Sequence, residues 1–337
     1  MLPVKRSRVA ILGGGSWGTT TASVISRHCD AILWARDGQI VDEINQAHTN
    51  HRYLGDAALN AKLAATTDIG AAVNQAEAVL IAVPSSHFRE VLASALSDLP
   101  MGIPLISLSK GLEKGSRMRM TEIIHDVAPG RIPGVLTGPN LAREIGAGQA
   151  AASVLALEDH EAALALQPKL NAGLFRVYTN QDVIGCELGG VLKNIIAIAV
   201  GMGDGLGAGD NTRAALITRG LAEMSRLGEA LGGKAETFAG LAGMGDMIAT
   251  CTSPQSRNRH VGMELAKGRS IDDIIDTMHM VAEGVKSAPT VIDLAQEKGI
   301  SLPISEDVYR VIIGESSARG VYRGLLRVTA GAESDPG

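Results

Sequence analysis

The chain has 337 residues, of which 45% are hydrophobic and 20% charged, so it is long enough for two globular domains and too apolar for intrinsic disorder. Its formal net charge of −5 argues against a nucleic-acid-binding protein, and no run of about 18 apolar residues indicates a membrane span. Three separated cysteines and eight scattered histidines suit neither a disulfide framework nor a metal site, so we expect a cytoplasmic protein without a metal.

The first half of the chain alternates short apolar runs with alanine-rich helical patterns. Four runs are continuous, as expected of strands buried on both faces of a parallel sheet, at 9–12, 31–34, 78–83 and 105–108. Three more strands are predicted at 135–136, 153–155 and 175–178. Strands separated by helical patterns favour right-handed βαβ units, so we predict an α/β domain with a Rossmann-type, mostly parallel sheet over residues 1–185.

The pattern changes near residue 183, where the strand signals end. Helical periodicity continues through the segments 187–200, 212–231, 256–267, 270–278, 287–298 and 305–313. We therefore predict an all-helical C-terminal domain over residues 186–331. The apolar surface of such a domain favours a homodimer.

The first predicted strand runs directly into Gly13, Gly15 and Gly18, which are spaced as G-x-G-x-x-G before a helical segment. In this context the first glycine permits a tight turn and the second lets the backbone approach a pyrophosphate. The third lets the helix pack closely on the strand, and the helix N-terminus then faces the anion. The motif predicts a dinucleotide site, and the alternative is a glycine-rich turn that binds no ligand.

Arg36 follows the second predicted strand, about 20 residues after the glycine motif, where such domains place the residue that contacts the adenosine ribose. An acidic residue there binds the ribose hydroxyls of NAD, whereas an arginine can pair with the 2′-phosphate of NADP. The sequence therefore favours NADPH without excluding NADH. The alternative is an exposed loop arginine.

Two polar segments follow predicted strands of the sheet. Residues 109–113, with the sequence SKGLE, come after the fourth strand, at the carboxyl edge where doubly wound sheets bind ligands. Residues 138–142, with the sequence GPNLA, follow a later strand and have the composition of a turn that presents backbone N–H groups. Both segments are candidates for ligand binding.

Lys193 lies in an otherwise apolar predicted helix. Burial of an unpaired ammonium is costly, so the pKa of this lysine should fall toward neutrality, which would make it a usable general acid–base. The alternative is a lysine whose ammonium reaches water at the end of its flexible stem.

Asp246 and the segment 256–258 supply an acid and a basic, hydroxyl-bearing group. Arg257, beside Ser256 and Asn258 at a predicted helix start, would suit a phosphate. Singly, each of these would be an ordinary polar surface residue.

Taken together, these segments closely resemble the bacterial-type NAD(P)-dependent glycerol-3-phosphate dehydrogenases over residues 9 to about 326. The motifs that carry the resemblance are GGGSWGT (13–19), SKGLE (109–113), GPNLA (138–142), LKN (192–194), ALITRGLAEM (215–224), GLAGMGD (240–246) and QSRNR (255–259). The resemblance implies reduction of dihydroxyacetone phosphate to sn-glycerol 3-phosphate, a precursor for phospholipid synthesis, by NADPH or NADH.

The resemblance also implies roles for individual residues. In the hypothetical mechanism Lys193 is the proton donor, with Lys110 and Asn194 stabilising the substrate oxygen. Cofactor contacts are expected from Ser16, Trp17, Arg36, Lys110, Ala142, Arg257, Val281 and Glu283, in addition to the motif glycines. Substrate contacts are expected from Lys110, Gly138, Asn140, Lys193, Asn194, Asp246, Ser256, Arg257 and Asn258.

Two positions depart from the family pattern. Asn140 stands where many members have Ser or Thr, and residues 285–288 are looser than the usual threonine-containing pattern. Two other functions stay open. A related dehydrogenase of the same architecture would act on a 3-hydroxyacid or a sugar acid, and a nucleotide-sensing regulator would keep the Rossmann domain without catalysis.

Overall fold

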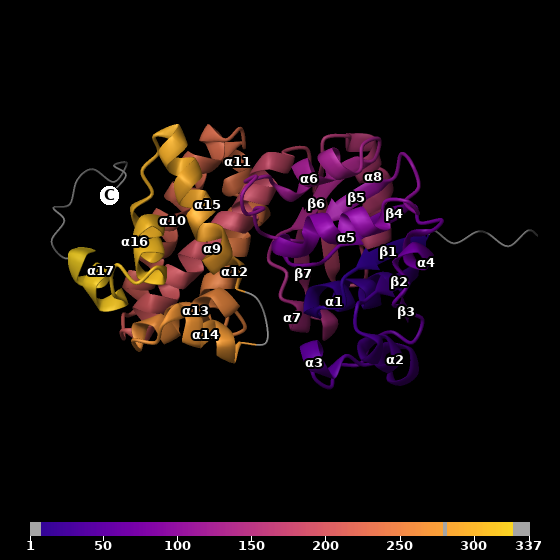
Figure 1. The fold of residues 1–337 in the computed structure, drawn as a ribbon, viewed down its shortest axis with the longest axis horizontal. Helices are drawn as coiled ribbons and strands as arrows, with labels where there is room; N and C mark the ends of the chain where they lie inside the picture. Colours follow the sequence, from indigo (N-terminus) through magenta and orange to yellow (C-terminus); the bar gives the residue numbers. More distant parts are fainter. Residues whose placement is uncertain (1–7, 279–281, 326–337) are drawn as a thin grey trace, which may run out of the picture. The chain divides into compact units, whose positions relative to one another are not determined.

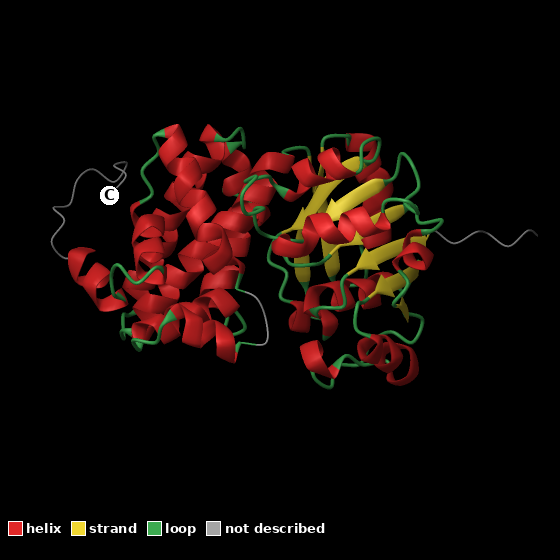
Figure 2. Ribbon diagram, in the orientation of Figure 1, coloured by secondary structure: helices red, strands yellow, loops and turns green. Residues whose placement is uncertain are grey.

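The structure is a computed structural model that describes residues 8–278 and 282–325, so the predicted cofactor contact Val281 lies outside the described residues. The chain divides into two compact units. Unit 1 contains residues 8–109 and 118–183, and unit 2 contains residues 110–117 and the described residues from 184 to 325. The ribbon views show that unit 1 has a central sheet and that unit 2 is built of helices (Figures 1 and 2).

Unit 1 is built on an eight-stranded sheet with the order β3-β2-β1-β4-β5-β6-β7-β8. All neighbouring pairs are parallel except β6 with β7, which confirms the predicted mostly parallel sheet. The strands are β1 (Arg8–Leu12), β2 (Asp30–Trp34), β3 (Ala64–Thr66), β4 (Ala78–Ile81), β5 (Pro104–Ser107), β6 (Ile132–Thr137), β7 (Ala151–Leu157) and β8 (Phe175–Asn180).

The two faces of the sheet explain the continuous apolar runs. In β1, Val9 and Ile11 belong to one hydrophobic core, whereas Ala10 and Leu12 belong to another, because successive side chains point to opposite faces. The helices of unit 1 are α1 (Ser16–Ile25), α2 (Gly38–Ala47), α3 (His51–Leu54), α4 (Ile69–Val73), α5 (Phe88–Ala95), α6 (Met120–Val127), α7 (Ala142–Gly146) and α8 (His160–Leu170), with a 3₁₀ turn at Ser85–His87.

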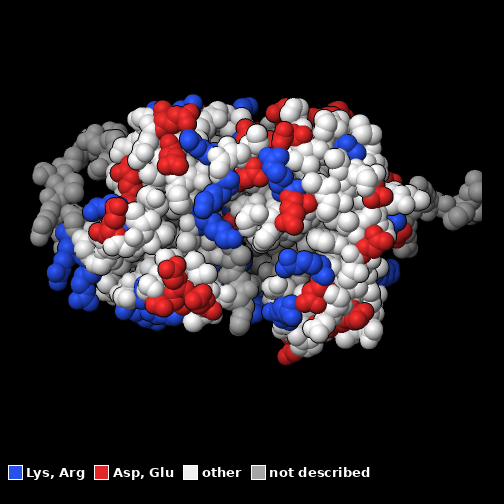
Figure 3. All heavy atoms as spheres, viewed as in Figure 1, with Lys and Arg blue, Asp and Glu red and all other residues white. Residues whose placement is uncertain are grey.

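Unit 2 contains no strand among its described residues, which confirms the predicted helical region. Its helices are α9 (Val183–Gly205), α10 (Asp210–Ala230), α11 (Ala235–Phe238), α12 (Asp246–Thr252), α13 (Arg257–Ala266), α14 (Ile271–Thr277), α15 (Glu283–Lys298), α16 (Pro303–Ile312) and α17 (Ala318–Leu325), with a π turn at Leu241–Gly245. On the face drawn in Figure 3, acidic and basic residues are interspersed.

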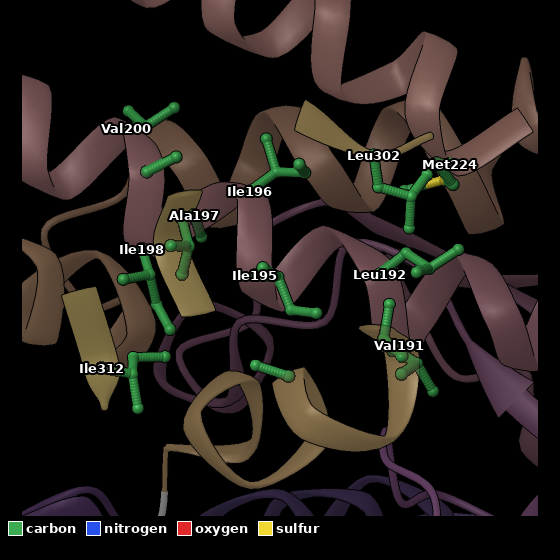
Figure 4. Packing of buried hydrophobic residues seen from close by; sticks show 14 of the residues in the cluster. Val191, Leu192, Ile195, Ile196, Ala197, Ile198, Val200, Met224, Leu302 and Ile312 are labelled. Carbon is green, nitrogen blue, oxygen red and sulfur yellow. The ribbon is translucent and has the colours of Figure 1, made fainter. Parts of the chain in front are cut away.

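Helix α9 supplies much of the core of unit 2. Figure 4 shows its apolar side chains in one packed cluster with Met224 of α10, with Leu302 just before α16 (Pro303–Ile312) and with Ile312 at the end of α16. Length and composition alone would let α9 cross a membrane, but 94% of its most apolar window is buried inside the structure. Burial of that kind is typical of a core helix in a globular unit.

Two glycines let α9 and α13 cross at backbone contact. A Cβ on Gly262 would lie 2.1 Å from the Ile198 carbonyl oxygen, and one on Gly201 would lie 2.0 Å from the Arg259 carbonyl oxygen. No larger residue fits at either position without a backbone shift. The crossing brings the start of α13 beside the middle of α9, where the candidate catalytic lysine lies.

The segment 110–117 packs with unit 2, although the sequence analysis placed it within residues 1–185. The reason is tertiary: Leu112 is buried in the helical core, and the Lys110 ammonium pairs with Asp246. Arg117, at a positive φ of 62°, also pairs with Glu297 of α15.

Candidate active site

The glycine-rich loop between β1 and α1 has the geometry that a bound pyrophosphate needs. Gly13 has a φ of 127°, and a Cβ there would lie 2.5 Å from the Ala82 carbonyl oxygen. A Cβ on Gly18 would lie 2.0 Å from the Gly13 carbonyl oxygen, so this glycine is needed for the helix to pack on the strand. Gly15 faces open space and caps α1 without a side-chain hydrogen bond, which leaves the first N–H groups of the helix for an anion.

The residues after the loop hold it in place. The buried Asn50 donates from its Nδ2 to the Gly14 carbonyl oxygen (3.0 Å) and to Thr19 Oγ1 (2.9 Å). The ring of Trp17 packs edge-on against Phe175 with centroids 6.1 Å apart, and its buried Nε1 has no partner among the described residues. Ser16 begins α1. The loop residues present therefore fit a dinucleotide.

The segment 138–142 follows β6 in unit 1. Gly138 has a φ of 120°, and a Cβ there would lie 3.3 Å from Ser153 Cα of the neighbouring strand β7. The hydroxyl of Ser153 donates to Asn140 Oδ1, which leaves the buried Asn140 Nδ2 without a partner among the described residues. Asn140 therefore offers an amide N–H where many family members have a hydroxyl. The Ala142 carbonyl oxygen accepts from Thr20 Oγ1 of α1 at 3.3 Å.

In unit 2, Lys193 and Lys110 share one buried carboxylate. Lys193 Nζ lies 2.5 Å from Asp246 Oδ1 and 2.6 Å from Thr250 Oγ1, while Lys110 Nζ lies 2.6 Å from Asp246 Oδ2. Lys193 is 5% exposed and Asp246 2% exposed, whereas the Lys110 side chain is 17% exposed. The cluster thus holds two cations and one anion in a region with little water.

The local backbone explains how this cluster forms. A Cβ on Gly189 of α9 would lie 2.7 Å from the Ala242 carbonyl oxygen, so α9 touches the π turn directly. One helical turn later Lys193 meets Asp246, which is the first residue of α12 and gains from the positive end of that helix.

Burial lowers the pKa of Lys193 from its usual value near 10.5 to about 8. Desolvation of the ammonium is the main cause, Asp246 opposes it, and the nearby Lys110 lowers the pKa further. A lysine with this pKa is largely protonated at pH 7 and still exchanges its proton readily. The neighbouring Cys251 thiol has a pKa raised to about 12 by burial, so it stays neutral.

Asn194, beside the lysine, belongs to an amide network. The Gly284 N–H donates to Asn258 Oδ1 (3.0 Å), and Asn258 Nδ2 donates to Asn194 Oδ1 (2.9 Å). These bonds fix both amide orientations and turn Asn194 Nδ2 toward the carbonyl oxygens of Gly190 (3.1 Å) and Lys110 (3.4 Å). In this structure the side-chain N–H groups of Asn194 therefore donate to backbone carbonyl oxygens of the protein.

The start of α13 presents the expected phosphate-binding residues. Ser256 caps the helix and accepts from the Arg259 N–H at 3.2 Å, and the next residue, Arg257, has an exposed side chain. Desolvation by surrounding protein lowers the pKa of the Arg257 guanidinium, while Glu283, the first residue of α15, opposes this. The Arg257 side chain is thus accessible to a ligand, while the protein around it partly desolvates the guanidinium. Both features suit a group that binds an anion such as a phosphate.

Thr250 is the site residue that sequence reasoning missed. Its hydroxyl contacts both Lys193 and Asp246, the latter at 3.3 Å. The available signal was its spacing, because Thr250 follows Asp246 by four residues and so shares its helix face. Two of the scattered histidines have local surroundings unrelated to this cluster: His51 pairs with Glu43 and Asp56, and His125 is exposed near the end of α6.

Comparison with known proteins points to one family. The model of the NAD-dependent glycerol-3-phosphate dehydrogenase N-terminus matches residues 8–163, and that of the C-terminus matches residues 182–323. A Sphingopyxis alaskensis protein named glycerol-3-phosphate dehydrogenase (NAD(P)+) 2 is 62% identical over 98% of this chain and 100% of its own length. A Mycobacterium tuberculosis relative named glycerol-3-phosphate dehydrogenase (NAD(P)+) 1 is 50% identical over 98% of this chain and 97% of its own length. The crystal structure of a Coxiella burnetii glycerol-3-phosphate dehydrogenase is 37% identical, with a TM-score of 0.90 over 96% of this chain and 99% of that one.

Proposed function

Because the chain belongs to the NAD-dependent glycerol-3-phosphate dehydrogenase family, we propose that it interconverts dihydroxyacetone phosphate and sn-glycerol 3-phosphate with NAD(P)H. The observation that carries the proposal is the buried Asp246 carboxylate shared by the buried Lys193 and the partly buried Lys110, with the pKa of Lys193 lowered to about 8. A lysine with a strongly lowered pKa is costly to bury, and such residues are typical of catalytic sites rather than of sites that only bind a ligand.

The reduction needs a hydride at the ketone carbon and a proton at its oxygen. When bound, the reduced nicotinamide supplies the hydride. Lys193 as ammonium gives its proton to the oxygen as negative charge develops there, and becomes a neutral amine. Asp246 and Thr250 hold Lys193 Nζ in place, and the Lys110 ammonium stabilises the developing charge. In the reverse direction neutral Lys193 accepts the hydroxyl proton.

Substrate orientation is assigned to a further set of residues. Arg257 binds the phosphate, remote from the reacting carbon, with help from Ser256, so that its binding energy fixes the geometry of reaction. Gly138, Asn140, Asp246 and Asn258 complete the proposed substrate contacts, and Asn194 supports them by holding Asn258 and the Lys110 backbone in place. The proposed cofactor contacts are Gly13, Gly15, Ser16, Trp17, Gly18, Arg36, Lys110, Ala142, Arg257, Val281 and Glu283.

Three further assignments belong to the same proposal: a homodimer, a cytoplasmic location, and supply of glycerol 3-phosphate for phospholipid synthesis. The exposed Ile248, Ile275 and Ile313 of unit 2 supply apolar surface for a dimer. The burial of the one strongly apolar helix among the described residues fits the proposed location, and the family match fits the metabolic role. The related 3-hydroxyacid and sugar-acid dehydrogenases are not favoured by the comparisons.

Dihydroxyacetone phosphate added to the purified protein with NADPH, or with NADH, should cause loss of the reduced-nicotinamide absorbance. Lys193→Met keeps an apolar stem and removes the proton, and should lower kcat by roughly 10³-fold while calorimetric cofactor affinity stays unchanged. Equal losses of turnover and cofactor affinity would remove the proton-donor role. Activity on non-phosphorylated hydroxyacids, and none on glycerol 3-phosphate, would overturn the proposed substrate.

A further inference from the structure

A second charged cluster lies at the end of β2, in unit 1, and the reaction chemistry does not use it. Asp37 directly follows Arg36 and caps α2 by accepting the Gln39 N–H at its Oδ1 (2.9 Å). Its other oxygen, Oδ2, accepts from Arg52 Nη1 at 2.6 Å. Both carboxylate oxygens of Asp37 are therefore engaged within the protein, and this acid is not presented to ribose hydroxyls as an NAD-binding acid would be.

Arg52 is held in position by the helix that carries it. Asn50, just before α3, ties that helix to the glycine-rich loop through the Gly14 carbonyl oxygen. Glu43 of α2 accepts from the His51 N–H (2.8 Å) and so ties the same turn to α2. The backbone of Arg52 is thus anchored on two sides, although its side chain is 52% exposed.

The end of β2 lies directly beside the glycine-rich loop. A Cβ on Gly14 would come within 2.7 Å of the Ala35 Cβ, and the Gly13 N–H donates to the Trp34 carbonyl oxygen at 2.9 Å. In a dinucleotide fold the adenosine ribose lies next to the pyrophosphate, over this strand end. Arg36 and Asp37 follow this strand end, and Arg52 pairs with Asp37, so all three residues belong to the part of the fold where the ribose 2′-substituent is expected.

We propose that Arg52, held by Asp37, is a second ligand of the 2′-phosphate of NADP(H) beside Arg36, and that this pair sets the cofactor preference. The inference rests on the proposed function for the presence of the cofactor. Arg36 is exposed and has no hydrogen bond or ion pair to any described residue, so it is available. Two guanidinium groups outweigh the one carboxylate, which leaves a net positive site for a phosphate dianion.

Arg52 has a second effect through Asp37. With Arg52 in place the Asp37 carboxylate is neutralised, whereas without it a bare carboxylate would repel the 2′-phosphate and attract ribose hydroxyls. Loss of Arg52 is therefore expected to move the preference toward NADH, and removal of the Asp37 charge in addition should restore part of the lost phosphate binding. Asp37→Asn suits this purpose because asparagine is also a good helix cap.

The test is calorimetric binding of 2′,5′-ADP and 5′-AMP to the full-length protein, since these differ only in the 2′-phosphate and need no turnover. The wild type should prefer 2′,5′-ADP, and Arg52→Ala should reduce that preference about tenfold or more with 5′-AMP affinity unchanged. Arg52→Ala with Asp37→Asn should recover part of the loss. Arg89→Ala, which removes the arginine of another surface pair, with Asp126, is the matched control and should change neither affinity.

Two outcomes would overturn the proposal. In the first, Arg52→Ala keeps the wild-type preference while Arg36→Ala abolishes it, which assigns the phosphate to Arg36 alone. In the second, the wild type binds 2′,5′-ADP no better than 5′-AMP. Turnover of dihydroxyacetone phosphate with NADH would then leave the proposed function intact, so the two failures are distinguishable.

Discussion

Two clusters in this chain combine the same charges in opposite environments. At the end of β2 Asp37 pairs with Arg52 in contact with water, and in unit 2 Asp246 pairs with Lys193 away from water. Each pair has a further cation beside it. At the surface the Gln39 N–H and then Arg52 hold the pKa of Asp37 below its usual value. In the interior desolvation outweighs the carboxylate and lowers the pKa of Lys193 to about 8.

The comparison shows that burial, rather than the set of charges, decides the chemistry. In water both partners of an ion pair stay charged, so the surface cluster suits recognition of an anion. In the interior the charged state of a lysine is costly, so its proton becomes transferable near neutral pH. The experiments below separate these two roles.

Asp246→Asn should have the largest effect. It leaves two ammonium groups without their carboxylate, so the free energy of unfolding should fall by about 3 kcal/mol, measured by urea denaturation. Because Asp246 raises the pKa of Lys193, its loss should also shift the pH profile of kcat to lower pH.

The matched control is Glu223→Gln, which alters a buried acid outside the cluster. Glu223 caps the start of α16 by accepting from the Ile304 and Ser305 N–H groups. This variant should lose stability but keep the wild-type pH profile. A profile that shifts equally in both variants would contradict the specific role of Asp246.

Thr250→Val should have a smaller effect, because it removes one hydrogen bond to the Lys193 ammonium and keeps the side-chain shape. We expect kcat to fall about tenfold, with Thr250→Ser close to wild type, in steady-state assays with saturating substrates. If serine were as impaired as valine, the hydroxyl would not be what positions the lysine.

Arg52→Ala should have the smallest effect on stability. The Asp37–Arg52 pair is solvent-exposed, so its loss should leave the urea midpoint unchanged within error, even as the nucleotide preference changes. A midpoint drop comparable to that of Asp246→Asn would show that the surface pair is structural, and would remove the contrast between the clusters.

The parts of the fold that the sequence predicted are those with strong local patterns. The apolar run of β1 is continuous because both of its faces are covered, and α9 keeps its helical periodicity over many turns. Strand β3, Ala64–Thr66, was missed because it has only three residues, lies at the edge of the sheet and contains a single β-branched residue. The antiparallel pairing of β7 and the membership of 110–117 in unit 2 depend on tertiary contacts that no local pattern encodes.

In the candidate site, too, local features were predicted from the sequence and long-range contacts were not. The burial of Lys193 and the fall of its pKa are confirmed, because a lysine in an apolar helix has few places to reach water. The Asp37–Arg52 pair and the amide orientation of Asn194 were not foreseen, since both depend on side-chain partners far along the chain. The catalytic and binding roles assigned to individual residues stay predictions.

The most direct test of the central claim is the pH dependence of kcat for dihydroxyacetone phosphate reduction in the wild type and in Lys193→Met. If Lys193 is the proton donor with a pKa of about 8, wild-type kcat should be level below that pH and fall above it as the ammonium is lost. The residual activity of Lys193→Met should show no such break. The same break near pH 8 in the variant would contradict the account, because another group would then be titrating.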